Sequence, residues 1–234
     1  MKYISFDGDC RVSRLGFGTG GFDGVGYRNN TLFSENPRVA AGVIRRAFDL
    51  GITVFDTAPI YGTEDFLRAL PRQQVFISTK SLRALGARNG WATVVTRNRE
   101  RLEESLSRFG HIDFYFFHAV TLGVFDKAGD LFEAALKWQK EGKIRYLGIS
   151  EDHSDKDHKM LHRALESDIF DVVMGVPNDT FPYKTVKELG INTFAMRAAL
   201  GDPNGYVAAL DKMDVVLIGT SSVKHLEEDV KLCG

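Results

Sequence analysis

The stretch AFDLGITVFDTAPIYG, residues 47–62, contains the end of a helix, a glycine and a short apolar strand that runs into an aspartate. Apolar side chains recur at helical spacing over residues 39–50, with charged side chains on the opposite face. Gly51 then ends the helix, because glycine tolerates the left-handed conformation found at helix ends. Val54 and Phe55 begin a strand, so this stretch predicts one helix-to-strand unit of an α/β protein.

The same alternation of strand and helix continues through the chain. The predicted strands are Leu15–Thr19, Val54-Phe55, Val75–Ser78, Phe114–Phe117, Tyr146–Ile149, Val172–Val176, Ile191–Ala195 and Val215–Ile218. The predicted helices cover residues 39–50, 64–70, 94–109, 131–136, 160–165, 183–189, 203–212 and 223–232. Strands that are mostly apolar are typical of a parallel sheet buried on both faces. Eight such units without a large insertion predict a closed (β/α)8 TIM barrel, with residues 1–234 as a single domain.

A β-hairpin is predicted before the first of these units. Tyr3–Phe6 and Cys10–Ser13 flank Asp7-Gly8-Asp9, and Asp-Gly between two apolar runs is a hairpin turn signal. We expect this hairpin to close one end of the barrel.

Composition excludes several classes of function. The 234 residues carry a net charge of −1, with 44% hydrophobic and 26% charged residues, as in a soluble globular protein. No basic patch predicts a nucleic-acid partner, and no apolar run approaches the roughly 18 residues that span a bilayer. The two cysteines, Cys10 and Cys233, form no disulfide framework, so we expect a cytoplasmic protein.

Polar side chains follow the apolar runs of the predicted strands. They are Asp56, Lys80, His118, Ser150, Asn178, Arg197, Thr220 and Ser221. In a parallel barrel the carboxyl ends of all strands meet at one face, where barrel enzymes carry their active sites. Strand ends also meet solvent, which alone accounts for exposed serines. An aspartate, a lysine and a histidine set against buried runs need partners, and therefore predict a functional site.

Five stretches resemble motifs of the aldo-keto reductase family, in the order in which that family has them. They are AFDLGITVFDTAPIYG, VFISTK, SRFGHIDFYFFHAV, EGKIRYLGIS and VVLIGTSSVKHLEEDV. The resemblance extends from about Val12 to Val230. It implies a barrel enzyme that reduces a small-molecule aldehyde or ketone to an alcohol with a nicotinamide cofactor. It implies nothing about the oligomeric state or the physiological substrate.

The family's catalytic residues correspond to Asp56, Tyr61, Lys80 and His118 in this sequence. A tyrosine is a weak acid with a pKa of about 10, and a nearby cation lowers that pKa by favouring the phenolate. By resemblance, Lys80 supplies the cation, Asp56 orients it, and His118 binds the substrate carbonyl beside Tyr61. Tyr61 is then the proton donor.

The family's cofactor positions lie in both halves of the chain. They correspond to Thr19, Gly20, Asp56, Ser150, Glu151, Met174, Met196, Arg197, Gly219, Thr220, Ser221, Lys224, His225 and Asp229. A helix predicted to start near Val223 presents N–H groups that favour a phosphate. The literal GxGxxG at residues 16–21 predicts a strand exit, since no helical pattern follows it. The resemblance favours NADP, and NAD stays possible because the family's usual cations are missing at Gly219 and His225.

Two departures keep other functions open. The family commonly has Ser-Asn where this sequence has Ser150-Glu151, and a glutamine where we align Met174. These departures favour, as an alternative, a redox-neutral dehydratase, isomerase or cyclase that uses Tyr61 and His118 for proton transfer. A non-catalytic binding module is a third possibility, and the complete set of four catalytic positions argues against it.

Two long loops, residues 20–37 and 81–91, are expected to contact substrate. Their aromatic residues Phe22, Tyr27 and Trp91 serve either as walls of the substrate site or in ordinary packing of the loops. His158 and His162 stand at i and i+4 of a predicted helix, a spacing that can bind zinc. We expect no metal site there, because the glutamate of the HExxH motif is missing and the surrounding stretch is charged and solvated.

Overall fold

The computed structural model describes residues 1–6, 10–20, 37–81, 90–199 and 201–234. Eight parallel strands form a closed barrel in the order β10-β3-β4-β5-β6-β7-β8-β9, so the predicted TIM barrel is confirmed. Their bounds are β3 Leu15–Gly18, β4 Val54–Asp56, β5 Phe76–Lys80, β6 Ile112–Val120, β7 Ile144–Glu151, β8 Val172–Gly175, β9 Asn192–Ala195 and β10 Val215–Ile218. Each strand begins and ends within two residues of its prediction, except that β6 ends three residues later than predicted.

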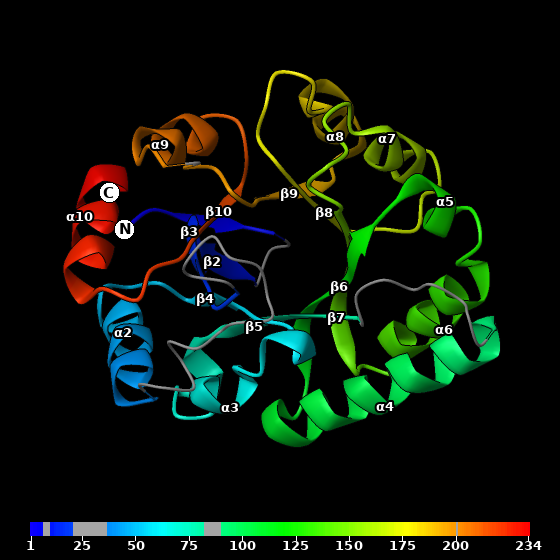
Figure 1. The fold of residues 1–234 in the computed structure, drawn as a ribbon, viewed down its shortest axis with the longest axis horizontal. Coiled ribbons are helices and arrows are strands. Elements are labelled where there is room, and N and C mark those ends of the chain that lie inside the picture. The colour runs from blue at the N-terminus through cyan, green and yellow to red at the C-terminus, as the bar shows by residue number, and fades with distance from the viewer. Residues whose placement is uncertain (7–9, 21–36, 82–89, 200) are drawn as a thin grey trace.

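Helices surround the barrel on its outside (Figure 1). They are α2 Pro37–Asp49, α3 Glu64–Leu67, α4 Trp91–Phe109, α5 Leu122–Phe125, α6 Gly129–Lys140, α7 Lys159–Leu165, α8 Tyr183–Leu189, α9 Asn204–Leu210 and α10 Val223–Cys233. The short helix α5 was not predicted, since four residues are too few for a periodic pattern. His158 was expected on a helix but precedes α7 with a φ of 54°, which places it in the left-handed region. That expectation was wrong.

The predicted hairpin is confirmed and covers the amino end of the barrel. Strands β1 Tyr3–Ser5 and β2 Arg11–Ser13 pair antiparallel. Just after β1, the ring of Phe6 lies 5.2 Å from Phe114, 5.7 Å from Tyr146 and 6.1 Å from Phe194. Figure 1 shows the hairpin within the ring of strands. The hairpin thus extends the apolar core and keeps water from entering the barrel at this end.

The apolar core has two layers, one inside the barrel and one between barrel and helices. Inside, Phe114, Phe116 and Met174 occupy alternate positions of their strands, as expected for side chains that point to one face. Gly148 makes room for Phe116, since a Cβ there would lie 2.5 Å from that ring. The filled interior confines any cleft to the ends of the barrel.

Aspartates stabilise the amino end of the barrel through the backbone. Three aspartates, one at the start of every second strand, each accept a hydrogen bond from a backbone N–H of the preceding strand. The pairs are Asp113 with Ile77, Asp171 with Leu147 and Asp214 with Thr193, each at 2.8 Å. Ser13 and Thr53 exchange equivalent bonds of 2.9 Å at the start of β4. These groups satisfy N–H donors that would otherwise be left without a partner where the strand ladder begins.

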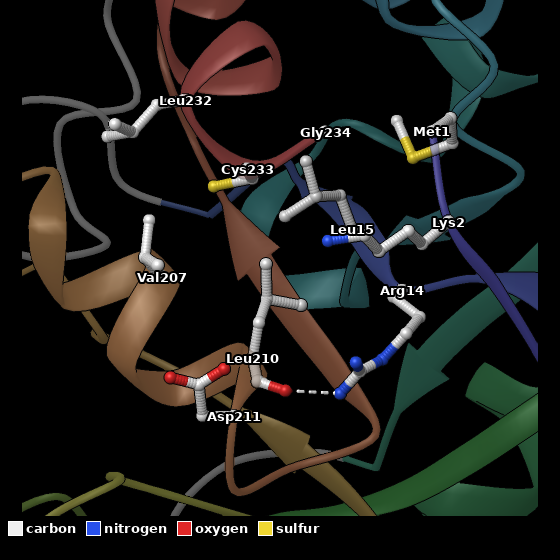
Figure 2. Close-up of a pocket in the computed structure, with 10 residues that line it drawn as sticks. All are labelled: Met1, Lys2, Arg14, Leu15, Val207, Leu210, Asp211, Leu232, Cys233 and Gly234. Atoms are coloured by element: carbon white, nitrogen blue, oxygen red, sulfur yellow. Dashed lines mark hydrogen bonds between the residues drawn. The ribbon is translucent and has the colours of Figure 1, made fainter.

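A small cavity of about 130 Å³ also lies at this end, between the hairpin, α9 and α10 (Figure 2). Arg14 borders it and donates to the backbone oxygens of Leu210, Met213 and Asp214. The guanidinium therefore satisfies carbonyl groups at the C-terminal end of α9. The role of Arg14 is therefore to hold the end of α9 against the hairpin.

Candidate active site

The carboxyl ends of the strands form a cleft of about 390 Å³ that brings the four predicted catalytic residues together. Asp56 ends β4, Lys80 ends β5, His118 lies near the end of β6, and Tyr61 ends a 3-10 turn after β4. All four side chains border the cleft. They come from three consecutive strands and the connection between two of them, which explains how residues distant in sequence converge.

Lys80 and Asp56 form a buried ion pair at the floor of the cleft. Lys80 Nζ lies 2.5 Å from Asp56 Oδ2 and 2.9 Å from the backbone oxygen of Thr57. Ser78 Oγ donates to the other carboxylate oxygen at 2.6 Å. Burial lowers the pKa of Lys80 below its ordinary value, although the charge of Asp56 acts in the opposite direction. The pair therefore keeps a cation in a dry site where its field is strong.

Tyr61 and His118 face one another across the cleft. The hydroxyl of Tyr61 lies 3.3 Å from His118 Nε2, and the two rings meet edge to face at 87°. Lys80 Nζ lies 5.2 Å from the centre of the Tyr61 ring. Gly62, with a φ of 66°, ends the turn that carries Tyr61, a conformation that glycine adopts at low cost. The phenol is thereby placed between a cation and an imidazole.

An irregularity in β6 shapes the wall beside His118. The pairing of β6 with β7 shifts between Phe117 and Val120, and Ala119 has a φ of 50°. His118 and Ala119 consequently both border the cleft, although neighbouring residues of a regular strand point to opposite faces. The backbone N–H of His118 donates to Ser81 Oγ at 2.9 Å, which ties the irregular segment to the end of β5.

The buried carboxylate of Glu64 supports the segments that carry Tyr61 and Lys80, and it was not predicted from the sequence. Its Oε1 accepts from Thr79 Oγ1 at 2.9 Å and from Ser105 Oγ at 2.7 Å, while Arg108 approaches its Oε2 at 3.3 Å. Glu64 thus joins the helix after Tyr61 to the strand residue before Lys80. Its partners Thr79 and Ser105 are 15 and 41 residues away along the chain, so no local sequence pattern indicated this role.

A wall of three residues continues the cleft across the next strands. Ser150 and Met174 are directly paired neighbours on β7 and β8, and Met196 follows β9. Ser150 Oγ lies 4.0 Å from the sulfur of Met196. Arg197, with a φ of 56°, borders the cleft beyond Met196. These four are among the positions that the resemblance assigns to the cofactor.

Glu151 differs from its neighbour Ser150 in where its side chain points. Its carboxylate accepts from the backbone N–H of Val176 at 2.8 Å and contacts His158 Nδ1 at 2.6 Å, and the side chain is 0% exposed. A Cβ on Gly175 would meet this carboxylate on the helix side of the sheet, next to Leu161. The Glu151 carboxylate therefore points away from the cleft that its backbone borders.

Thr19 and Gly20 begin the connection from β3 to β4, and they contribute to the site in different ways. Thr19 is fully buried, and its hydroxyl bonds to Thr63 at 2.6 Å and to the backbone oxygen of Asp56 at 3.0 Å. Gly20 borders the cleft, and a Cβ there would lie 2.6 Å from the ring of Tyr61. Glycine at this position is thus required by the close approach of backbone and phenol.

The far end of the cleft reaches Gly219, just before α10. Ser222 begins this helix and accepts from the backbone N–H of His225 at 3.3 Å, which confirms the predicted helix start. The side chain of Lys224 is exposed and lies 3.8 Å from Glu228. The remaining predicted positions here do not border the cleft but lie in or beside the first turns of α10; they are Thr220, Ser221, Lys224, His225 and Asp229.

Tyr206 was not predicted and also borders this end of the cleft. It comes from α9. Burial and the charge of Asp229 raise its pKa to about 12. Its phenol is therefore neutral at ordinary pH.

The candidate substrate walls fall in different places. Phe22 and Tyr27 lie outside the described residues. Trp91 begins α4 and packs against the apolar layer under the helices, and it does not border the described part of the cleft. His158 is buried and not solvated as expected, and the described residues contain no cluster that could hold a metal ion.

Comparison with known proteins identifies the family of this chain. A model of the Aldo/keto reductase family matches residues 14–197, so the chain belongs to the aldo-keto reductase family. It is 33% identical over 161 residues to "Probable aldo-keto reductase 1" of Glycine max, a match covering 62% of this chain and 43% of that protein. It is 32% identical over 152 residues to "L-galactose dehydrogenase" of Arabidopsis thaliana, covering 60% and 45%. The matches thus span less than half the length of these curated relatives.

Solved structures share the fold along nearly the whole chain. A putative aldo-keto reductase from Pseudomonas aeruginosa has a TM-score of 0.74 at 23% identity, over 99% of this chain and 93% of that one. An aldo-keto reductase from Klebsiella pneumoniae in complex with NADPH has a TM-score of 0.70 at 17% identity, over 99% and 89%. Within the described residues, no helix combines the length and apolar character needed to cross a membrane.

Proposed function

We propose that the protein is an NAD(P)H-dependent oxidoreductase that reduces a small aldehyde or ketone to an alcohol, with Tyr61 as the proton donor. The observation that carries this proposal is the position of the Tyr61 hydroxyl, 3.3 Å from His118 Nε2 and beside the buried Lys80–Asp56 pair. Membership of the aldo-keto reductase family and the NADPH complex of a structural neighbour support it.

The described part of the cleft fits a nicotinamide dinucleotide. Gly20 and Tyr61 both border the cleft, and the backbone at Gly20 passes close to the phenol, since a Cβ there would lie 2.6 Å from the ring. The cleft then runs from His118 to Gly219, beside the start of α10, whose first N–H groups favour a phosphate. Ser150, Met174 and Met196 would border the nicotinamide end. When bound, the reduced cofactor supplies a hydride to the carbonyl carbon.

The chain's own residues supply the proton and the orientation. The Lys80 cation stabilises the phenolate of Tyr61 and so makes the phenol a better acid. Asp56, held by Ser78, keeps Lys80 in place and balances its charge. The Tyr61 hydroxyl and His118 Nε2 are close enough for one carbonyl oxygen to bond both, which aims that oxygen at the proton of Tyr61.

The choice between NADP and NAD is part of the proposal. Lys224 is the cation at the start of α10, and its contact with Glu228 is exposed and weak. We propose NADP as the preferred cofactor, with Lys224 contacting its additional phosphate. Dissociation constants of NADPH and NADH, measured by quenching of protein fluorescence, test this preference; equal constants would contradict it.

The test of the reaction is the variant Tyr61→Phe. Reduction of a panel of small aldehydes is followed by loss of absorbance of the reduced nicotinamide. We expect this variant to lose about 10²–10⁴-fold in kcat, because general acid catalysis is lost, while its dissociation constant for NADPH stays near that of the wild type. Near-normal carbonyl reduction by Tyr61→Phe would remove Tyr61 as the proton donor.

A redox-neutral reaction on the same barrel is the second candidate. The thioethers of Met174 and Met196 favour it, because a thioether is only a weak hydrogen-bond acceptor for a carboxamide at the proposed nicotinamide end of the cleft. Tyr61 and His118 would then transfer protons without a hydride. A wild-type protein that binds neither NADPH nor NADH in the fluorescence titration would favour this candidate over the first.

A further inference from the structure

Three side chains form a buried hydrogen-bonded chain behind the wall of the cleft. Glu151 Oε2 lies 2.6 Å from His158 Nδ1, and His158 Nε2 lies 2.7 Å from Asn178 Oδ1. The side chains of Glu151 and His158 are both 0% exposed. This chain, Glu151–His158–Asn178, joins the end of β7, the residue before α7 and the loop after β8.

The partners of Asn178 determine which nitrogen of His158 carries a proton. The backbone N–H of Thr180 donates to Asn178 Oδ1 at 3.0 Å, and Asn178 Nδ2 donates to the backbone oxygen of Lys156 at 3.3 Å. The oxygen of the amide therefore faces His158. Since Oδ1 can only accept, His158 Nε2 is protonated and donates to it.

Glu151 and His158 then share a single proton in the neutral state of the pair. The other carboxylate oxygen of Glu151 accepts from the backbone N–H of Val176 at 2.8 Å. Burial raises the pKa of Glu151. Burial lowers the pKa of His158, but its bonds to Glu151 and Asn178 outweigh this and leave that pKa above its ordinary value. Each polar atom of the pair thus has a partner, as a buried polar group requires.

The backbone at His158 has a left-handed conformation that is uncommon for a residue with a Cβ. Its φ of 54° lies in the left-handed region, which disfavours a residue with a Cβ. Its carbonyl accepts from the N–H of His162 at 2.9 Å and so begins α7. The ring of Phe181 packs edge-on against the imidazole at 5.3 Å. Such conformations persist where the surroundings determine them, and they gather near functional sites.

The chain lies directly against the cleft wall formed by Ser150 and Met174. Glu151 is the neighbour of Ser150, and Gly175 is the neighbour of Met174. A Cβ on Gly175 would lie 2.7 Å from Glu151 Oε1, so the carboxylate packs against the backbone of β8. Because Ser150 and Met174 are paired across β7 and β8, a shift of the carboxylate moves both sides of the wall.

We propose that Glu151, His158 and Asn178 are positioning residues that hold the Ser150–Met174 wall in the geometry required by the nicotinamide end of the cofactor. This inference rests on the proposed function. It explains why a carboxylate at position 151 is compatible with nicotinamide binding, since its charge is directed to His158 and away from the ring. The adenosine end, at Gly219 and α10, lies outside the influence of this chain of residues.

Two probes separate the two ends of the cofactor. NADPH reports on the whole cleft, and adenosine 2′,5′-bisphosphate reports on the adenosine end. We expect Glu151→Ala to weaken NADPH binding about tenfold, because the Val176 N–H and His158 lose their partner, and to leave the bisphosphate constant unchanged. Glu151→Gln should bind NADPH like the wild type, since its amide oxygen can accept from Val176 and its amide nitrogen can donate to His158 Nδ1.

Further variants keep the test decisive. Asn178→Ala, at the more exposed end of the chain, should weaken NADPH binding in the same direction but less, which covers the case in which Glu151→Ala does not fold. Glu188→Ala removes an exposed glutamate from α8 and should change neither constant. Equal weakening of both probes by Glu151→Ala, unchanged NADPH binding, or no rescue by Glu151→Gln would each overturn the inference. A wild-type protein that fails to bind NADPH would instead overturn the proposed function, and the inference with it.

Discussion

The two ends of the barrel use carboxylates in different ways. At the amino end, Asp113, Asp171 and Asp214 accept hydrogen bonds from backbone N–H groups of neighbouring strands. At the carboxyl end, Asp56 bonds side chains, namely Lys80 and Ser78. A carboxylate that accepts from the backbone N–H of a neighbouring strand stabilises the pairing of the two strands. The carboxylate of Asp56 instead holds the charged Lys80 beside the phenol of Tyr61. We therefore expect the same residue type to serve the fold at one end and the proposed reaction at the other.

The largest expected effect is at the carboxyl end. Lys80→Met should lower kcat for aldehyde reduction by about 10²–10⁴-fold, because the cation that favours the phenolate of Tyr61 is lost. It should also destabilise the fold by about 3–5 kcal/mol, since Asp56 is left as an uncompensated buried charge. Thermal unfolding and steady-state kinetics measure the two effects.

The double variant Lys80→Met/Asp56→Asn separates stability from chemistry. Removing both charges should restore most of the lost stability but none of the activity. If the double variant regained activity together with stability, the Lys80–Asp56 ion pair would serve only the stability of the fold, as the aspartates at the amino end do.

The second expected effect is the dependence of the rate on pH. Burial lowers the pKa of Lys80, so the reductase rate should fall as pH rises through a value below the ordinary 10.5. The charge of Asp56 raises the pKa of Lys80. In the variant Asp56→Asn, the remaining activity should therefore be lost at a lower pH than in the wild type. Rates of carbonyl reduction measured from neutral to alkaline pH test the shift. A fall at the same pH in both proteins would assign it to another group.

The third expected effect is at the amino end. Asp113→Ala removes the acceptor of the Ile77 N–H and the partner of Arg72, so it should destabilise the fold by about 1–3 kcal/mol. Because this end is remote from the cleft, kcat per folded molecule should stay unchanged. Denaturant unfolding measures the free energy of unfolding, and kinetics combined with active-site titration give kcat per folded molecule. A lower kcat at unchanged stability would show that Asp113 acts on the reaction and not on the fold.

The smallest expected effect comes from the hydroxyl that holds Asp56. Ser78→Ala removes one hydrogen bond of 2.6 Å, worth about 1 kcal/mol, and should lower kcat by roughly fivefold. Thr79→Val is the matched control, because the Thr79 hydroxyl bonds Glu64 on the other side of the strand. The control should lose stability and keep kcat. Equal losses of kcat in both variants would contradict a specific role of Ser78, because any hydroxyl removed from β5 would then lower the rate.

Tyr61 was predicted only through the family resemblance. The sequence by itself determined the order of the eight strand–helix units, the hairpin and the placement of Asp56, Lys80 and His118 where strands end. Each of these depends on short-range patterns: helical spacing, apolar runs, glycine at helix ends and polar residues where strands end. Residues at the carboxyl ends of parallel strands must meet at one face, so their convergence follows from the strand order alone. Family resemblance added the assignment of roles.

Only the tertiary structure decided where several polar side chains point. Glu151 turns to the helix side because His158, the Val176 N–H and the space beside Gly175 are there, and none of these contacts is local in sequence. The left-handed backbone of His158 and the support of Glu64 behind Tyr61 depend in the same way on distant partners. The free energy of a buried polar group is set by the groups around it, and the folded chain alone specifies those groups.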